Sequence, residues 1–141
     1  MIDPDLRLQK PLEDYVETFD KLIPRAISLF EDLVDDTYVF SDPYQRVQGY
    51  KGLSNILNAR YGLCKSSRYR VHDFMWGRRD NTAYMFWEYT FEVIRRRKSD
   101  VGAITGMSEL MFTQQGKILS HTDFWGAHDA FDIKTYKDLK L

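Results

Sequence analysis

The feature that most constrains the fold is a run of four long β-type segments in the second half of the chain. They cover residues 67–77, 82–95, 101–113 and 117–125 and are rich in aromatic and β-branched residues. The connectors, residues 78–81, 97–100 and 114–116, are short and contain turn-forming residues. Because short connectors join antiparallel neighbours, the sequence predicts a four-stranded antiparallel meander.

The first half of the chain carries helical patterns instead. Apolar residues at helical spacing over 12–23 predict a helix. Pro11 suits its first turn, and Pro24 ends or kinks it. Further predicted elements are helices over 25–33 and 49–62 and a strand over 36–40. Helices followed by a meander predict an α+β fold. A long, twisted, mostly antiparallel sheet of this kind can curl around the N-terminal helices and enclose a cavity.

Length and charge narrow the class of protein. The 141 residues predict a single domain, residues 1–141. With 20 basic and 21 acidic residues the chain lacks the basic excess of nucleic-acid-binding proteins. One cysteine, Cys64, excludes an intrachain disulfide framework and a multi-cysteine metal site. The N-terminus has no apolar signal core, and no apolar run approaches the roughly 18 residues of a membrane span. We therefore expect a cytoplasmic protein. The tail, 127–141, is expected to be a short helix or to fray.

Strand alternation identifies the side chains that could meet inside such a cavity. Every second residue of a strand lies on the same face, which places His121, Asp123 and Trp125 together on the last strand. Leu119 has the same parity. Charged groups are rarely buried without a partner, so this face is unusual for a plain core. Five aromatic residues either line the pocket or simply belong to the core, namely Tyr44, Trp87, Tyr89, Phe91 and Trp125.

Two acidic positions have both a functional and a structural interpretation. Asp42 ends a strand directly before Pro43, so it is either a general base at the pocket mouth or a turn residue. His121 and Asp123 form either a proton-transfer pair or a structural hydrogen-bonded pair. Cα atoms two residues apart on a strand are about 6.5–7 Å apart, which permits a direct bond between the two side chains. Their spacing fits no metal signature, and we expect neither a metal nor a cofactor.

Several motifs together resemble a known family. A strand ending in Asp-Pro precedes a glycine-led helix, and the later motifs are GMSELMF, QGKI and HTDFWG. Their order, from about Tyr38 to Gly126, resembles the SnoaL-like branch of the ketosteroid isomerase and nuclear-transport-factor-like superfamily. The resemblance implies a cone-shaped α+β barrel around a ligand pocket, which often dimerises through its outer sheet face.

The resemblance also implies roles for single residues. Asp42 matches the general base of ketosteroid isomerases, and Asp123 resembles the acid/base aspartate of SnoaL-like cyclases. Ser108 is at the position where the isomerases have the second carboxylic acid of their oxyanion hole. It is either a hydrogen-bond donor to a substrate oxygen or a serine that bonds only to the strand backbone. Tyr15 lies in the element that carries the isomerase tyrosine, out of register with it.

Two hypotheses about function follow. The first is a cofactor-free isomerase, cyclase or dehydratase that uses an aspartate as general acid/base. Its substrate would be a small apolar molecule such as a steroid, polyketide, terpenoid or lipid fragment, and the protein would be a homodimer. The second is a non-catalytic ligand-binding or dimerisation module of the same fold.

Overall fold

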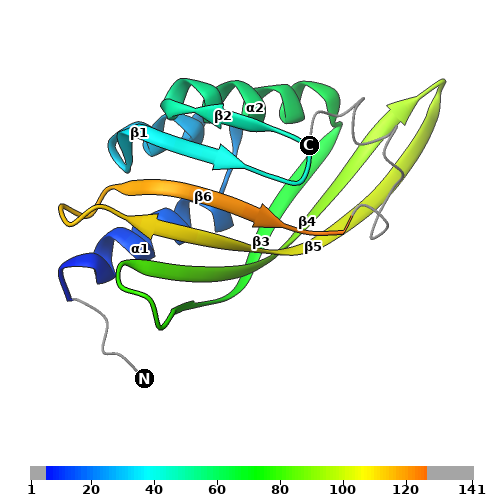
Figure 1. Cartoon of the computed structure of the whole chain (residues 1–141). Coiled ribbons are helices and arrows are strands. Elements are labelled where there is room, and N and C mark those ends of the chain that lie inside the picture. The colour runs from blue at the N-terminus through cyan, green and yellow to red at the C-terminus, as the bar shows by residue number, and fades with distance from the viewer. Residues whose placement is uncertain (1–5, 127–141) are drawn as a thin grey trace.

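The structure, a computed structural model, describes residues 6–126, with two α-helices, one 3₁₀-helix and six strands (Figure 1). In chain order these are α1 (Leu6–Asp20), η1 (Pro24–Asp32), β1 (Val34–Ser41), β2 (Arg46–Gln48), α2 (Gly49–Leu63), β3 (Ser66–Trp76), β4 (Thr82–Arg95), β5 (Lys98–Phe112) and β6 (Ile118–Phe124). The predicted tail, 127–141, lies outside the described residues. No helix in the described range is long and apolar enough to cross a membrane.

The six strands form one curved, unclosed sheet in the order β2-β1-β6-β5-β4-β3 (Figure 1). The predicted meander β3-β4-β5-β6 is confirmed, and so is the α+β class. β1 extends the sheet beyond β6 as a parallel neighbour, and β2 pairs with β1 antiparallel. The sequence did not predict the short strand β2 or the parallel pair, which joins segments about 80 residues apart.

Two helical predictions need correction. Pro11 does not open the first helix, because α1 begins by Leu6 and Pro11 lies inside it. Its missing N–H costs one backbone hydrogen bond, but its ring sits against the β5–β6 turn, where a Cβ on Gly116 would be 3.0 Å from the proline Cγ. The second predicted helix is the 3₁₀-helix η1, which starts at Pro24.

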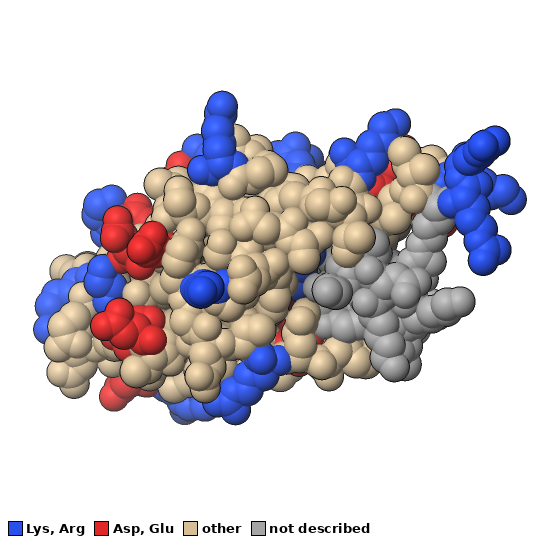
Figure 2. Space-filling model, turned by 90° about the horizontal axis from the view of Figure 1, so that it is seen from above, with Lys and Arg blue, Asp and Glu red and all other residues tan. Residues whose placement is uncertain are grey.

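The β4–β5 hairpin is longer than the sequence predicts. Arg95 pairs with Lys98, so the turn consists of Arg96 and Arg97 rather than residues 97–100. Both turn residues have positive φ, 47° and 67°, as a two-residue type I′ turn requires. This tip projects beyond the rest of the sheet in Figure 1, and Figure 2 shows basic side chains gathered at the same end of the molecule. The basic run 95–98 therefore lies at the tip of this hairpin.

A bulge at Leu119 changes which side chains at the start of β6 point inward. The β5–β6 register moves from Met111↔Ser120 to Phe112↔Ile118, which leaves Leu119 as an extra residue. Such a β-bulge reverses the alternation. Ile118 is therefore buried and Leu119 exposed, so the predicted common face of Leu119 and His121 was wrong.

Two glycines on β5 make room for large aromatic rings on β4. Gly106 pairs with Trp87, and Gly102 pairs with Phe91. A Cβ on Gly106 would lie 2.6 Å from the Trp87 indole, and one on Gly102 would overlap the Phe91 ring. Because only glycine permits this close approach, both rings lie flat across β5 on the inner face of the sheet.

Candidate active site

Asp123 is the centre of a buried polar network on the inner face of the sheet. β6 lies between β5 and β1, so both of its edges are paired and its inward side chains are deep in the fold. Asp123 is 6% exposed and His121 1% exposed. The Asp123 carboxylate oxygen Oδ1 lies 2.5 Å from His121 Nε2 and 2.5 Å from Ser108 Oγ. The sequence predicted that His121 and Asp123 share a face, and the structure brings them into direct contact.

The network continues from His121 into the helical layer. Tyr15 Oη lies 2.7 Å from His121 Nδ1, and Tyr38 Oη lies 2.9 Å from Tyr15 Oη. In a neutral imidazole one ring nitrogen donates and the other accepts. With Nε2–H donated to Asp123, Nδ1 accepts from Tyr15, and Tyr15 accepts from Tyr38. Four side chains on α1, β1 and β6 thus form one continuous hydrogen-bonded chain.

Ser108 completes the other side of the network. It lies directly opposite Asp123 in the β5–β6 register and donates its hydroxyl proton to the carboxylate. Trp87 Nε1 donates to Ser108 Oγ at 2.8 Å. The only proton of Ser108 is therefore already committed to Asp123, and none is left for a substrate oxygen.

Asp42 lies in a turn, outside this network. Its carboxylate accepts hydrogen bonds from the backbone N–H of Tyr44 at 2.9 Å and of Gln45 at 3.0 Å, and from the Gln45 side chain at 3.0 Å. The Asp42 N–H donates to the Gln45 carbonyl. These bonds close an Asx-type turn between β1 and β2, which is what the structural interpretation of Asp42 requires.

Arg60 is the functional candidate that sequence analysis missed. The residue is 5% exposed, and its guanidinium donates through Nη1 to Tyr69 Oη and lies 3.8 Å from the Asp42 carboxylate. Burial acts to lower the pKa of Arg60, but the hydroxyls of Tyr69 and Tyr89 and the carboxylates of Asp123 and Asp42 raise it overall. Arg60 follows the buried α2 residues Leu53, Ile56 and Leu57 at intervals of seven, four and three, a spacing that places it on the inward face of the helix.

The predicted aromatic residues divide into two groups. Trp87, Tyr89 and Phe91 are buried on the inner face of β4. Tyr44 and Trp125 contact each other with ring centroids 5.8 Å apart, and Tyr44 is 40% exposed. The first group therefore lies in the interior and the second nearer to the surface. Tyr38, which belongs to the hydrogen-bonded chain from Asp123, was not predicted as a site residue, although it alternates with Phe40 on β1.

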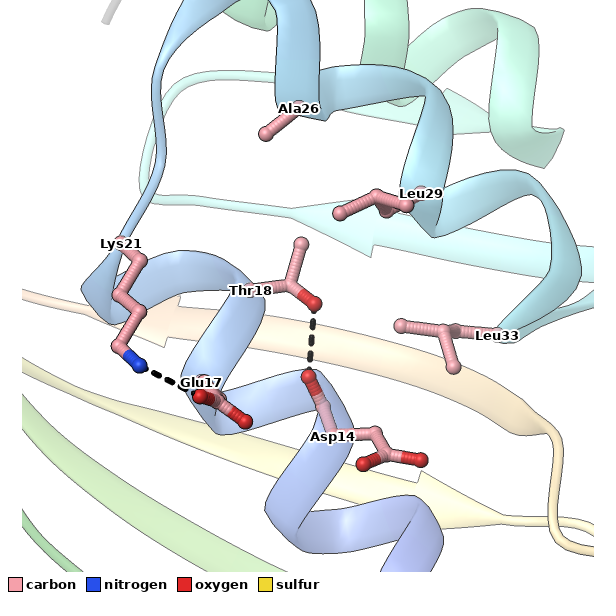
Figure 3. Close-up of a pocket in the computed structure, with 7 residues that line it drawn as sticks. All are labelled: Asp14, Glu17, Thr18, Lys21, Ala26, Leu29 and Leu33. Atoms are coloured by element: carbon pink, nitrogen blue, oxygen red, sulfur yellow. Dashed lines mark hydrogen bonds and ion pairs between the residues drawn. The ribbon is translucent and has the colours of Figure 1, made fainter.

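Two surface hollows lie beside α1, apart from the network. The first, between α1 and η1, has about 350 Å³ of space (Figure 3). Its lining residues are Asp14, Glu17, Thr18, Lys21, Ala26, Leu29 and Leu33. The second, between α1 and β3, has about 410 Å³ and includes Val71 and Phe74. Neither is lined by a predicted site residue. Within residues 6–126, no three His, Cys, Asp or Glu side chains are grouped as metal ligands.

The buried tyrosines of the site should titrate at higher pH than exposed tyrosines. Burial raises the pKa of Tyr15, Tyr38, Tyr69 and Tyr89 above 10.0, the ordinary value for tyrosine. We expect these four of the nine tyrosines to stay protonated in the folded protein after the pH passes 10. Because the unfolded chain then releases more protons than the folded chain, stability should be intact below about pH 10 and fall above it.

An ultraviolet titration of tyrosinate measures this directly. Until it unfolds, the folded protein should show a smaller absorbance change than nine titrating tyrosines would give, because the four buried tyrosines stay protonated. A urea-unfolded sample, in which every tyrosine titrates near pH 10, is the control. A folded protein that gives the full absorbance change at the same pH as the unfolded one would contradict the buried network.

Comparisons with known proteins agree on the fold. No family model matches the chain, and no curated protein does. The epoxide hydrolase/cyclase-like enzyme SalBIII, with a role in pyran ring formation in the polyether salinomycin, superposes with a TM-score of 0.71 at 12% identity, covering 90% of this chain and 96% of its own. A candidate SnoaL-like polyketide cyclase from Shewanella denitrificans gives 0.67 at 13% identity, over 86% and 91%.

A steroid delta-isomerase from Pseudomonas aeruginosa gives a TM-score of 0.65 at 15% identity, covering 99% of this chain and 90% of its own. At sequence identities this low, the structural similarity establishes a common architecture and leaves the chemistry open. The architecture expected from the Asp-Pro, GMSELMF and HTDFWG motifs is confirmed. The chain has the fold shared by SnoaL-like, NTF2-like and ketosteroid isomerase-like proteins.

Proposed function

We propose that this protein is a cofactor-free acid–base enzyme of the isomerase, cyclase or lyase type, with Asp123 as the group that moves the proton. The observation that carries the proposal is the unequal use of the two carboxylate oxygens. Both hydrogen bonds to Asp123 among residues 6–126 end on Oδ1, from His121 and Ser108. Oδ2 accepts none of the hydrogen bonds found there. One oxygen therefore fixes the carboxylate in place, and the other has lone pairs for a substrate proton.

The neighbours of Asp123 suit this role. Ser108 and Trp87 hold the carboxylate from one side, and His121 holds it from the other. His121 is itself held in place, because its Nδ1 contacts Tyr15. Proton transfer by a positioned side chain contributes about 10²–10⁴-fold to rate. Asp42 supplies no second base in this scheme, since backbone and side-chain donors and Arg60 surround its carboxylate.

The proposed substrate is a small apolar carbonyl compound of the steroid, polyketide, terpenoid or lipid type. Trp87, Tyr89 and Phe91 make the interior on this side of the sheet aromatic and apolar, which favours an apolar ligand. The structural neighbours support the reaction class, since they include a polyketide cyclase candidate and a steroid isomerase.

Proton exchange tests the function before the substrate is known. The protein is incubated in deuterated buffer with a panel of enolisable compounds that includes a 3-ketosteroid, a β-diketone and a cyclic enone. Nuclear magnetic resonance then follows deuterium uptake next to the carbonyl. The proposal expects exchange of at least one compound well above the rate in buffer and with an unrelated protein. Ligand binding with no exchange across the panel would support the binding-module hypothesis instead.

The outer face of the sheet supports the proposed homodimer. Phe86, Met107 and Phe124 lie side by side across β4, β5 and β6. Phe86 is 37% and Phe124 is 50% exposed, which is unusual for large apolar side chains in a continuous row. Sedimentation velocity should give a dimer, and Phe86→Glu should convert it to a monomer. A monomeric parent protein would overturn this part of the proposal.

A further inference from the structure

Proton abstraction next to a carbonyl needs a hydrogen-bond donor as well as a base. As the carbon loses its proton, the electron pair of the C–H bond moves into a new C=C bond, and the carbonyl oxygen takes up negative charge. Enzymes place donors at this oxygen, where one donor contributes about 10²–10³-fold. The residues around Asp123 offer few donors, because Ser108 donates to Asp123, and Trp87 donates to Ser108. In the assigned tautomer Tyr15 also donates its proton, to His121.

Arg60 carries the unused donor. Within the described range, Arg60 Nε is the one buried side-chain nitrogen or oxygen that has no hydrogen-bond partner. Nη1 donates to Tyr69, and Nη2 is 3.8 Å from Asp42, an ion-pair distance longer than a hydrogen bond. A buried donor without a partner costs about 1–3 kcal/mol, more when it is charged. That cost is recovered when an acceptor reaches Nε.

Two sets of contacts connect Arg60 to the interior around Asp123. On one side the guanidinium lies 5.9 Å from the centroid of the Phe40 ring, and that ring packs against His121 at 4.8 Å. On the other side Tyr69, which accepts from Arg60, packs against the Trp87 ring at 5.9 Å. Each of these two rings adjoins a residue of the Asp123 network. The base and the unused donor thus belong to the same part of the interior.

We infer that Arg60 is a further catalytic residue of the proposed site, which donates its Nε–H to the acceptor oxygen of the substrate. The inference rests on the proposed function and specifies the substrate class as a carbonyl compound whose oxygen becomes an enolate. Asp123 takes the proton from carbon, the electrons move to the carbonyl oxygen, and Arg60 binds that oxygen. Return of the proton to the same carbon, or to the far carbon of a conjugated dienolate, restores the carbonyl and the Asp123 carboxylate, so no oxidant or reductant is needed.

A chromogenic phenol reports on this oxygen site without turnover. 4-Nitrophenol is titrated with the protein, since its phenolate mimics an enolate oxygen and absorbs visible light. 4-Nitroanisole, in which a methyl group replaces the proton, is the matched ligand control. We expect the protein to bind the phenolate, lower the apparent pKa of the phenol and discriminate against the anisole. The variants are Arg60→Met and Arg60→Lys, with the exposed Arg68→Met as the matched control.

Loss of one charge-assisted hydrogen bond should weaken phenolate binding about 10- to 100-fold in both Arg60 variants, while Arg68→Met leaves it unchanged. Arg60→Lys keeps the positive charge and serves if Arg60→Met does not fold. Equal binding of the two ligands, absence of phenolate binding by the parent protein, or unchanged binding by the folded Arg60 variants would overturn the inference. The exchange assay separates the two proposals, because exchange can persist when Arg60 has no role, and Arg60 can bind phenolate in a protein that catalyses no exchange.

Discussion

Replacing Asp42 with alanine is expected to destabilise the protein by about 3–5 kcal/mol, the usual cost of removing one member of a buried ion pair. The Asp42 side chain is fully buried, and its partner Arg60 is almost so. Alanine removes the acceptor of three hydrogen bonds from Tyr44 and Gln45, and it leaves Arg60 without its contacting anion. Since domains of this size are stable by about 5–15 kcal/mol, the loss is a large share of the total.

Urea unfolding measures this loss, and three further variants identify its source. Asp42→Asn keeps an oxygen acceptor for the turn but removes the charge, so it should cost less than alanine. Asp42→Ala combined with Arg60→Met removes both charges and should recover part of the loss, which a double-mutant cycle measures as coupling. Asp36→Ala, at an exposed position on the same strand, should change stability by less than about 0.5 kcal/mol. A cost for Asp42→Ala as small as that of Asp36→Ala would contradict a structural role.

Prediction from the sequence worked best where one local period decides the result. The alternation along β4 correctly assigned Trp87, Tyr89 and Phe91 to the interior. Alternation failed at Leu119, because a single inserted residue reverses the facing of everything before it on β6. The bulge leaves no mark in the sequence, since it is set by pairing with β5.

The remaining differences come from contacts between distant segments. Nothing local to residues 34–41 shows that this strand pairs in parallel with β6, and that pairing brings Tyr38 to Tyr15 and Phe40 to His121. Arg60 had a detectable signal, since it continues the buried stripe of α2, but arginine is normally exposed. Its partners Asp42 and Tyr69 come from two other elements, so only the folded chain identifies the guanidinium as buried.

Asp123→Asn is expected to reduce the rate of catalysed exchange by about 10²–10⁴-fold, the contribution of a positioned general acid/base. Asparagine has nearly the shape of aspartate, and its amide oxygen can accept the bonds that Ser108 and His121 now give to Oδ1. The nitrogen that replaces Oδ2 has no basic lone pair, so the variant keeps the hydrogen bonds that hold the side chain and loses the base. The fold should survive, with a melting temperature close to that of the parent protein.

The comparison that decides the assignment sets Asp123→Asn beside Asp42→Asn and Asp73→Asn. Asp73 is exposed on β3 and controls for loss of one negative charge. If Asp123 is the base, Asp123→Asn loses exchange with little loss of stability, and Asp42→Asn loses stability with its exchange largely kept while folded. The opposite pattern would make Asp42 the base, as its match to the isomerase position implies. Exchange rates within about threefold of the parent rate in all three variants would rule out either aspartate as the general base. Loss of a true general base lowers the rate by at least about 10²-fold.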